Sequence, residues 1–387
     1  MQHPQLENLS ELVALRQEIH QFPEVSGAEQ GTAARIVAHL QRYQPDEVHT
    51  TVGGTGVAAV FYGKQPTEGP TVLFRAELDA LPIAETNHDL SYCSTAEGVG
   101  HKCGHDGHMA ILTGMASLLH RHKPARGKAV LLYQPAEETG AGAFAVLQDE
   151  RMERLKPDFV FALHNLPGVK LHQVVIRNNV FAAASTGMVI ELHGKSSHAA
   201  EPENGLNPGK AMAEIILAFD QIIQQKEQFR DLALLTVIHA KLGDVAFGTN
   251  PGFATVMATL RAYQPEDFAL LKQLATRIVE ERAAKYSLSH TISFVEEFPA
   301  TVNNAAAVDV VKKAAQQLNF DVREAVHPFR WSEDFGHFTA QAPGALFGLG
   351  SGMGQPQLHH SDYDFPDEII PTGASLFYQI FQALQTP

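Results

Sequence analysis

Cysteine is scarce in this chain: Cys93 and Cys103 are the only two among 387 residues. Two cysteines are too few for the disulfide framework of a secreted protein, so we expect a reducing compartment, the cytoplasm. Long apolar runs are also lacking, because no window offers about eighteen consecutive uncharged apolar residues. The N-terminus has no apolar segment typical of a signal peptide. The sequence therefore predicts no export signal and no contact with a membrane.

Positive charge is in the minority, with 29 Lys and Arg against 43 Asp and Glu and a formal net charge of -14. No dense basic cluster is interleaved with aromatic residues, so we expect no nucleic-acid partner. What the chain does have is an ordinary globular composition, with 44% hydrophobic and 19% charged residues. Its length favours two domains.

Short apolar runs predict buried strands in the first half of the chain. Three of these runs lead at once into side chains that bind metals or move protons: residues 71–74, 129–133 and 158–163. The side chains that follow them are Glu77 and Asp79, Glu137 and Glu138, and His164. Because ligands in open α/β sheets gather at the carboxyl ends of strands, we expect these side chains to lie near one another.

The most unusual stretch, residues 98–108, reads GVGHKCGHDGH and combines three histidines, a cysteine and an aspartate with several glycines. Glycine lets the backbone turn tightly, and Cys103 and His105 are residue types that bind Zn²⁺ and similar ions. Taken alone, the stretch favours a metal-binding or nucleophilic Cys103 over a turn whose histidines only cap the helix predicted from Met109 to His120.

The pair Glu137 and Glu138 favours the metal interpretation, because adjacent carboxylates at the end of a buried strand are costly without a neutralising cation. Neighbouring residues of a strand point to opposite sides. We therefore expect one carboxylate to bind the metal and the other to face the attacking water as a general base.

The pattern changes near residue 185 to strand, helix, strand, strand, helix, strand. We place these elements at residues 186–192, 207–225, 232–241, 252–263, 265–285 and 290–297. This order is the split βαβ arrangement of a ferredoxin-like unit. Alternating strands and helices resume after Pro299. We expect a catalytic α/β domain made of residues 1–184 and 298–387, with residues 185–297 inserted as a second domain.

The motifs together resemble those of the M20 metallopeptidases, in the aminoacylase and amidohydrolase branch. That branch includes hippurate hydrolases, N-acetyl-amino-acid deacetylases and auxin-conjugate hydrolases. The matching segments run in the family's order: 75–82 (RAELDALP), 103–108 (CGHDGH), 134–138 (QPAEE), 164–167 (HNLP), 194–200 (GKSSHAA), 332–335 (SEDF) and 358–359 (LH). The resemblance implies a mixed sheet flanked by helices, as in zinc exopeptidases, and an inserted ferredoxin-like α+β domain that acts as a lid and in dimerisation.

The resemblance also implies two divalent metal ions, Zn²⁺ or Mn²⁺ with Co²⁺ and Ni²⁺ as alternatives, that share the Cys103 thiolate. The implied ligands are Cys103, His105, Glu138, His164 and His359, with Glu137 as general base. His198 would stabilise the oxyanion from the inserted domain of the neighbouring subunit in a homodimer. Asn250 and Arg261 would bind the substrate.

One position departs from the family pattern. Residue 77 is usually Asp in this branch and is Glu77 here, which is one methylene longer. Its carboxylate is expected to support the catalytic site. The resemblance therefore predicts a metal-dependent amidohydrolase that cleaves N-acyl amino acids or similar small amides, using metal-activated water with Glu137 as general base. A thiol hydrolase built on Cys103 and His105 and a non-catalytic metal-binding relative are the alternatives.

Overall fold

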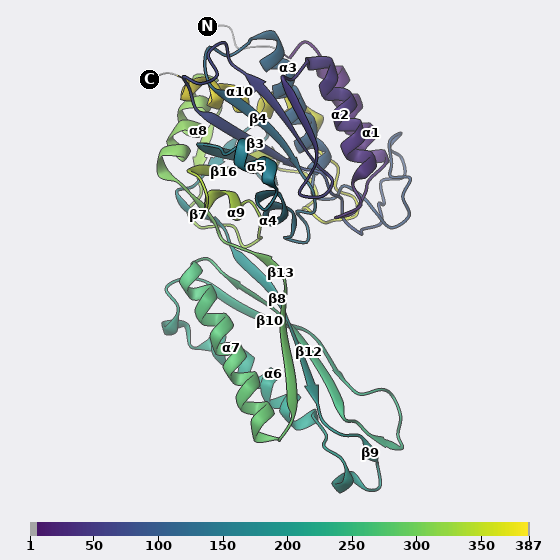
Figure 1. The fold of residues 1–387 in the computed structure, drawn as a ribbon. Coiled ribbons are helices and arrows are strands. Elements are labelled where there is room, and N and C mark those ends of the chain that lie inside the picture. The colour runs from purple at the N-terminus through teal and green to yellow at the C-terminus, as the bar shows by residue number, and fades with distance from the viewer. Residues whose placement is uncertain (1–5, 386–387) are drawn as a thin grey trace. The chain divides into compact units, whose positions relative to one another are not determined.

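A computed structural model describes residues 6–385 of the chain (Figure 1). It divides into two compact units. Among the described residues, the first unit comprises 6–181, 301–327 and 334–385, and the second comprises 182–300 and 328–333. The second unit thus includes residues 328–333, and residues 182–184 and 298–300 at its ends, all of which were expected in the catalytic domain. Backbone hydrogen bonds explain the placement of residues 328–333, because Ala183 donates its N–H to the carbonyls of Phe329 and Trp331.

The first unit is built on an eight-stranded mixed sheet with the order β1-β2-β4-β3-β5-β16-β6-β15. Neighbours among β4, β3, β5 and β16 run parallel, whereas β1 and β2 are joined antiparallel on one side. The strands are β1 (Glu47–Val52), β2 (Gly56–Tyr62), β3 (Thr71–Glu77), β4 (Lys128–Gln134), β5 (Phe159–Pro167), β6 (Val174–Ile176), β15 (Val322–Glu324) and β16 (Gly344–Gly352). A separate pair is formed by β7 (Asn179–Ala182) and β14 (Thr301–Asn303).

Helices flank this sheet, which confirms the predicted α/β fold class (Figure 1). The long ones are α1 (Leu9–Gln21), α2 (Gln30–Leu40), α3 (His105–Arg121), α8 (Ala305–Gln317) and α10 (Ile370–Leu384). The short ones are α4 (Gly142–Leu147), α5 (Glu150–Arg154) and α9 (Gly336–Thr339), with 3₁₀ turns η1 (Gln41–Tyr43) and η4 (Asp367–Ile369). Helix α3 packs against α1, α10 and β3.

The core of the first unit forms where these helices cover the sheet. Phe74 of β3 stacks on Phe161 of β5 with ring centres 5.8 Å apart, and lies 5.2 Å from the ring of Phe377 on α10. Consecutive residues Val72 and Leu73 of β3 are both fully buried. A parallel strand covered on both faces is expected to read as a continuous apolar run, which is the signal that predicted this strand.

Two local expectations are wrong. Helix α3 begins at His105 and not near Met109, because Gly104 takes the left-handed conformation (φ +91°) and starts the helix inside the motif. His105, Asp106 and His108 are therefore in the first helical turn. The spacing of Asn8 and Glu11 in the sequence predicts a capping box at the start of α1. In the structure, Asn8 makes no cap hydrogen bond and its side chain donates to the Tyr43 hydroxyl.

The second unit is a four-stranded antiparallel sheet, β10-β12-β8-β13, with two long helices. Its main elements are β8 (Ala184–His193), α6 (Gly209–Gln224), β10 (Ala233–Leu242), β12 (Phe253–Ala262), α7 (Pro265–Lys285) and β13 (Ser289–Phe298). Its small elements are β9 (Ser197–His198), β11 (Thr249–Asn250), η2 (Pro202–Asn204) and η3 (Lys226–Gln228). Each main element lies within two residues of its predicted place, and the order of strands and helices is that of a ferredoxin-like unit.

Within residues 6–385, no helix is both long and apolar enough to cross a membrane.

Candidate metal centre

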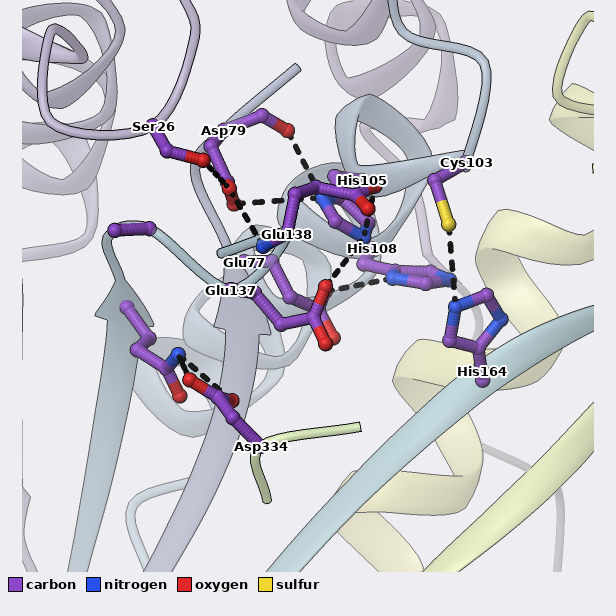
Figure 2. Close-up of polar contacts among 12 residues, drawn as sticks. Ser26, Glu77, Asp79, Cys103, His105, His108, Glu137, Glu138, His164 and Asp334 are labelled. Atoms are coloured by element: carbon purple, nitrogen blue, oxygen red, sulfur yellow. Dashed lines mark hydrogen bonds and ion pairs between the residues drawn. The ribbon is translucent and has the colours of Figure 1, made fainter. Parts of the chain in front are cut away.

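The first unit brings metal-binding side chains together at the carboxyl ends of its parallel strands and the start of α3 (Figure 2). His164 lies in β5, and Glu137 and Glu138 follow β4. Cys103 lies just before α3, and His105 is the first residue of that helix. Glycine at position 104 is required here. A Cβ atom there would stand 2.7 Å from the side-chain nitrogen of Asn165, so only glycine lets the turn approach β5.

Cys103, His105 and His164 form a group of possible ligands in which all three residues are buried. One donor atom from each lies within 4.8 Å of the other two. The Cys103 sulfur is 3.5 Å from Nε2 of His164. His105 and His164 use their other ring nitrogens on backbone carbonyls, with Nδ1 of His105 2.8 Å from the Asp79 oxygen and Nδ1 of His164 3.0 Å from the Asn165 oxygen. This is the arrangement that orients metal-binding imidazoles.

Glu137 and Glu138 lie in a turn after β4 and not at the strand end itself, because β4 stops at Gln134. Ala136, just before them, has a left-handed backbone (φ +50°). Both carboxylates converge on His105: an oxygen of each is 3.8 Å from its Nε2. The expectation that they point to opposite sides is therefore wrong, since the alternation of a strand does not extend into this turn.

His359 reaches the same cluster from a loop near the C-terminus. Its Nε2 is 3.9 Å from a Glu138 oxygen, and with Cys103 these residues form a second group of donors within 4.8 Å of one another. The side chain of His359 is about half exposed (51%), which makes it the most accessible member of the cluster. Its neighbour His360 is in neither group of donors.

Glu77 is fully buried beneath the cluster. It forms an ion pair with Arg75, and its other oxygen is 2.7 Å from Nδ1 of His108. His108 in turn uses Nε2 on the side-chain oxygen of Asn165, at 2.7 Å. Both nitrogens of His108 are thus occupied by protein groups, although Glu77, His105 and His108 also have donor atoms within 4.8 Å of one another. The longer Glu77 is accommodated by contact with both partners at once.

Arg75 links Glu77 to a further carboxylate at the base of the site. Its Nη2 donates to Asp334 at 2.7 Å, and its Nε donates to Gln134 at 2.9 Å. Gln134 itself donates to both oxygens of Asp334 (Figure 2). The matched segments RAELDALP, QPAEE and SEDF are therefore joined through these buried side chains.

Asp79, which the sequence placed near the other site residues without giving it a role, supports the cluster through hydrogen bonds. Its Oδ2 accepts hydrogen bonds from Ser26 Oγ at 2.7 Å and from the backbone N–H of Glu138 at 2.9 Å. Its backbone oxygen accepts from His105, and its Oδ1 lies 3.6 Å from the same ring nitrogen. In the sequence, Asp79 follows Glu77 by two residues, just after β3 and within the segment RAELDALP.

Burial and neighbouring charge shift the protonation of the cluster. Burial works to raise the pKa of Glu77, but Arg75 and His108 outweigh it and leave that pKa well below its usual range. Burial also works to lower the pKa of His105, but the Cys103 and Glu77 charges outweigh it and raise that pKa well above normal. For Cys103, burial and then Glu138 raise the pKa. The buried anions thus stabilise positive charge at His105.

The residues present fit a bound cation. Nε2 of His105 is buried, points at both carboxylates and has no hydrogen-bond partner within the described part of the chain. Thiolate, imidazole and carboxylate are the donors that Zn²⁺ takes in proteins. A buried nitrogen aimed at two carboxylates and a thiol is what a divalent ion at this place would satisfy.

The other three predicted site residues belong to the second unit. His198 is exposed in β9, and its Nδ1 accepts from the N–H of Ala200 at 3.1 Å. Asn250 is buried in β11 and donates to Ser197 Oγ at 3.0 Å. Arg261 of β12 donates to Ser332 Oγ at 2.8 Å, and burial lowers its pKa.

Comparison with known proteins identifies the group to which the chain belongs. The sequence pattern of peptidase family M20/M25/M40 matches residues 73–383. The N-acetyl-L-cysteine deacetylase of Bacillus subtilis is 31% identical over 370 residues, which cover 95% of this chain and 87% of the relative. The hippurate hydrolase of Campylobacter jejuni is 30% identical over 372 residues, which cover 96% of this chain and 95% of the relative.

A solved structure gives the same answer. The YXEP protein of Bacillus subtilis, described as a dinuclear metal binding peptidase from the M20 family, superposes with a TM-score of 0.82 and 25% identity. The match covers 97% of this chain and 98% of that one. These findings confirm the predicted family and the prediction of a metal-dependent hydrolase of C–N amide bonds. The chain belongs to peptidase family M20/M25/M40.

Proposed function

We propose that this protein hydrolyses the amide bond of N-acyl amino acids or similar small amides with two divalent metal ions, Zn²⁺ or Mn²⁺, in the first unit. One observation carries the proposal: two of the groups of donors, Cys103 with His105 and His164, and Cys103 with Glu138 and His359, share the same thiol. A thiolate within reach of both groups would serve as a ligand for each of two ions. The named activities of the N-acetyl-L-cysteine deacetylase and the hippurate hydrolase support the substrate class.

Cys103, His105, Glu138, His164 and His359 would hold the ions. When bound, the ions supply Lewis acidity toward the amide carbonyl and lower the pKa of a water molecule at the site to about 7. Glu137 is suited to the remaining proton transfer. It is buried, its Oε2 lies at the cluster, and a carboxylate there takes a proton from the attacking water and returns it to the leaving amine.

The inserted unit would supply the other contacts, as a lid and as the interface of a homodimer. β10 is an edge strand of its sheet, and Ile238 on it is 63% exposed. Val245 and Phe247, in the segment after β10, are fully exposed. An unpaired strand edge with exposed apolar side chains favours pairing with a second copy.

His198, placed in the neighbouring subunit's site by such a dimer, would donate to the oxyanion. Arg261 would bind the substrate carboxylate, for which a guanidinium is suited because its fork can hold two oxygens. Asn250 is proposed as a second substrate contact. Its side chain bonds to Ser197 next to His198 and accepts from Asn207, so it also shapes the segment that carries His198.

The test is turnover of a panel of N-acetyl, N-benzoyl and longer N-acyl amino acids by protein stripped with a chelator and then reloaded with Zn²⁺, Mn²⁺, Co²⁺ or Ni²⁺. We expect no turnover in the stripped protein and recovery with at least one ion. Glu137→Gln should bind metal normally and lose activity by at least about a hundredfold, the usual range for a general base. Full activity of the stripped protein, or of Glu137→Gln, contradicts the proposal.

The thiol-hydrolase alternative is less well supported. Without a metal ion, burial and the nearby Glu138 carboxylate raise the pKa of Cys103, so this thiol needs a neighbouring cation to become the thiolate that either role requires. That alternative also assigns no role to Glu138, His164 and His359. Inactivation of metal-free, active protein by a thiol alkylator would favour it over the metal mechanism.

A further inference from the structure

A second group of charged side chains is buried in the first unit beside the proposed metal centre. Nε2 of His20 is 2.9 Å from Glu85, and its Nδ1 is 2.9 Å from Asp106. Arg16, also on α1, contacts Asp106 at 3.5 Å, and Lys102 contacts Glu85 at 2.5 Å. All five side chains are buried. None of them is among the proposed ligands, and the proposed chemistry uses none of them.

Lys102 is the member of this group with the most direct connection to the ligands. It immediately precedes Cys103, and it joins the turn with Cys103 to the loop with His359 at two places. Its carbonyl accepts the backbone N–H of His359 at 2.7 Å. Its Nζ donates to the carbonyl of Tyr363 at 2.9 Å, four residues further along the same loop.

The loop that Lys102 holds has a conformation that needs support. His359 has a left-handed backbone (φ +66°), which is uncommon for a residue with a side chain and persists only where neighbouring contacts impose it. The N–H of His359 is bonded to Lys102, and Tyr363 further on donates its N–H to His360. The two bonds from Lys102 therefore fix both ends of residues 359–363.

The buried Lys102 ammonium is poorly suited to increasing the stability of the fold alone. Removing it from water carries a desolvation cost that its partners must offset, and an apolar side chain of the same length would fill the space without that cost. The ammonium instead makes directional hydrogen bonds to Glu85 and to the Tyr363 carbonyl, and these bonds fix the position of the loop. Glu85 is itself held by His20 and by the N–H of Ser94 at 2.6 Å.

We infer that Lys102 is a positioning residue for the metal pair: it ties the turn with Cys103 to the loop with His359, so that the two donor groups sharing Cys103 form together. The inference rests on the proposed function. It predicts that loss of the Lys102 ammonium weakens the ion held with His359 and spares the ion held by His105 and His164.

The test measures metal binding and not only activity. Wild type, Lys102→Met and Glu85→Gln are loaded with Zn²⁺, and the dissociation constant of each ion is measured by chelator competition. We expect the dissociation constant of the ion held with His359 to rise about 10- to 100-fold in both variants, as when a supporting partner of a metal ligand is lost. Lys272→Met is the matched control, because Lys272 pairs with Glu297 at 2.8 Å in the second unit.

A double-mutant comparison separates positioning from general stability. If Lys102 acts through His359, adding Lys102→Met to a His359→Ala variant should leave zinc affinity unchanged from His359→Ala alone. A merely structural lysine would lower the melting temperature of the metal-free protein and leave both zinc constants at the wild-type values, which would overturn the inference. Should Lys102→Met fail to fold, Glu85→Gln, which preserves shape, decides between the same two outcomes.

The two proposals fail in different ways. Wild-type protein that binds fewer than two zinc ions contradicts the proposed dinuclear site, and the role of Lys102 falls with it. Wild type that binds two ions, with unchanged constants in Lys102→Met and Glu85→Gln, contradicts the role of Lys102 and leaves the proposed function intact.

Discussion

At the scale of single residues, the proposed centre depends on side chains that bind no metal themselves. Asp79 contacts both halves of the cluster, through the N–H of Glu138 and through His105. Glu77 and Asn165 together occupy both nitrogens of His108. These partners fix the direction of each ring and carboxylate before an ion arrives, which is what a preorganised site requires.

Asp79 provides the first prediction at this scale. In Asp79→Ala the buried N–H of Glu138 loses its acceptor, so we expect a loss of about 1–3 kcal/mol in the free energy of unfolding. We also expect metal affinity or activity to fall about 10- to 100-fold. Chelator competition and urea unfolding measure the two effects.

Ser26→Ala is the matched control for Asp79→Ala. It removes only one of the hydrogen bonds to the Asp79 carboxylate and leaves the bond to Glu138 in place. Its effect on metal affinity should be clearly smaller. Equal effects of the two substitutions, or an unchanged metal affinity in Asp79→Ala, would show that Asp79 does not orient the cluster.

The sequence predicted the proposed metal ligands better than the residues that support them. Cys103, His105 and Glu138 stand in short motifs whose composition indicates metal binding, and the structure brings them together with His164 and His359. The sequence placed Asp79 near the site but gave it no role, and Lys102 carries no such signal, because a single Lys next to a motif is usually a solvated residue. Their contacts come from segments far apart in the chain, which periodicity does not report.

At the scale of elements, the start of α3 determines where the ligands lie. Sequence periodicity indicated the apolar part of this helix but not its first turn, because residues 105–108 are polar and contain a glycine. Tertiary contacts with β3 and β5 replace the missing apolar pattern: His105 bonds to Asp79, and His108 bonds to Asn165. In the same way, the turn at Ala136 redirected both glutamates away from the alternation expected of a strand.

Replacing Gly104 tests the close approach at the start of α3. Gly104→Ala should destabilise the metal-free protein by more than the roughly 1–3 kcal/mol of a strained left-handed residue, because its Cβ also meets the Asn165 amide at 2.7 Å. Urea unfolding measures the change. Gly98→Ala is the control, since Gly98 is also left-handed (φ +73°) but has no heavy atom within 4 Å of its Cβ position. Equal losses in both variants would contradict the close approach.

At the scale of the whole molecule, the order of elements was the most predictable feature. The apolar runs of β3, β4 and β5 and the strand and helix pattern of residues 184–298 are local signals, and the structure has elements at these places. The assignment of residues 328–333 to the second unit was not predictable from the sequence. It depends on backbone hydrogen bonds with Ala183, which lies more than a hundred residues away in the chain. Both units still contribute residues to the function that we propose.

The central claim is that one cluster in the first unit holds two ions through a shared Cys103. The most direct measurement is the metal-to-chain ratio of the wild-type protein and of Cys103→Ala after loading with Zn²⁺ and removal of free metal. We predict two ions per chain in the wild type and fewer than two in Cys103→Ala. One ion or none in the wild type, or two ions retained in Cys103→Ala, would contradict the claim.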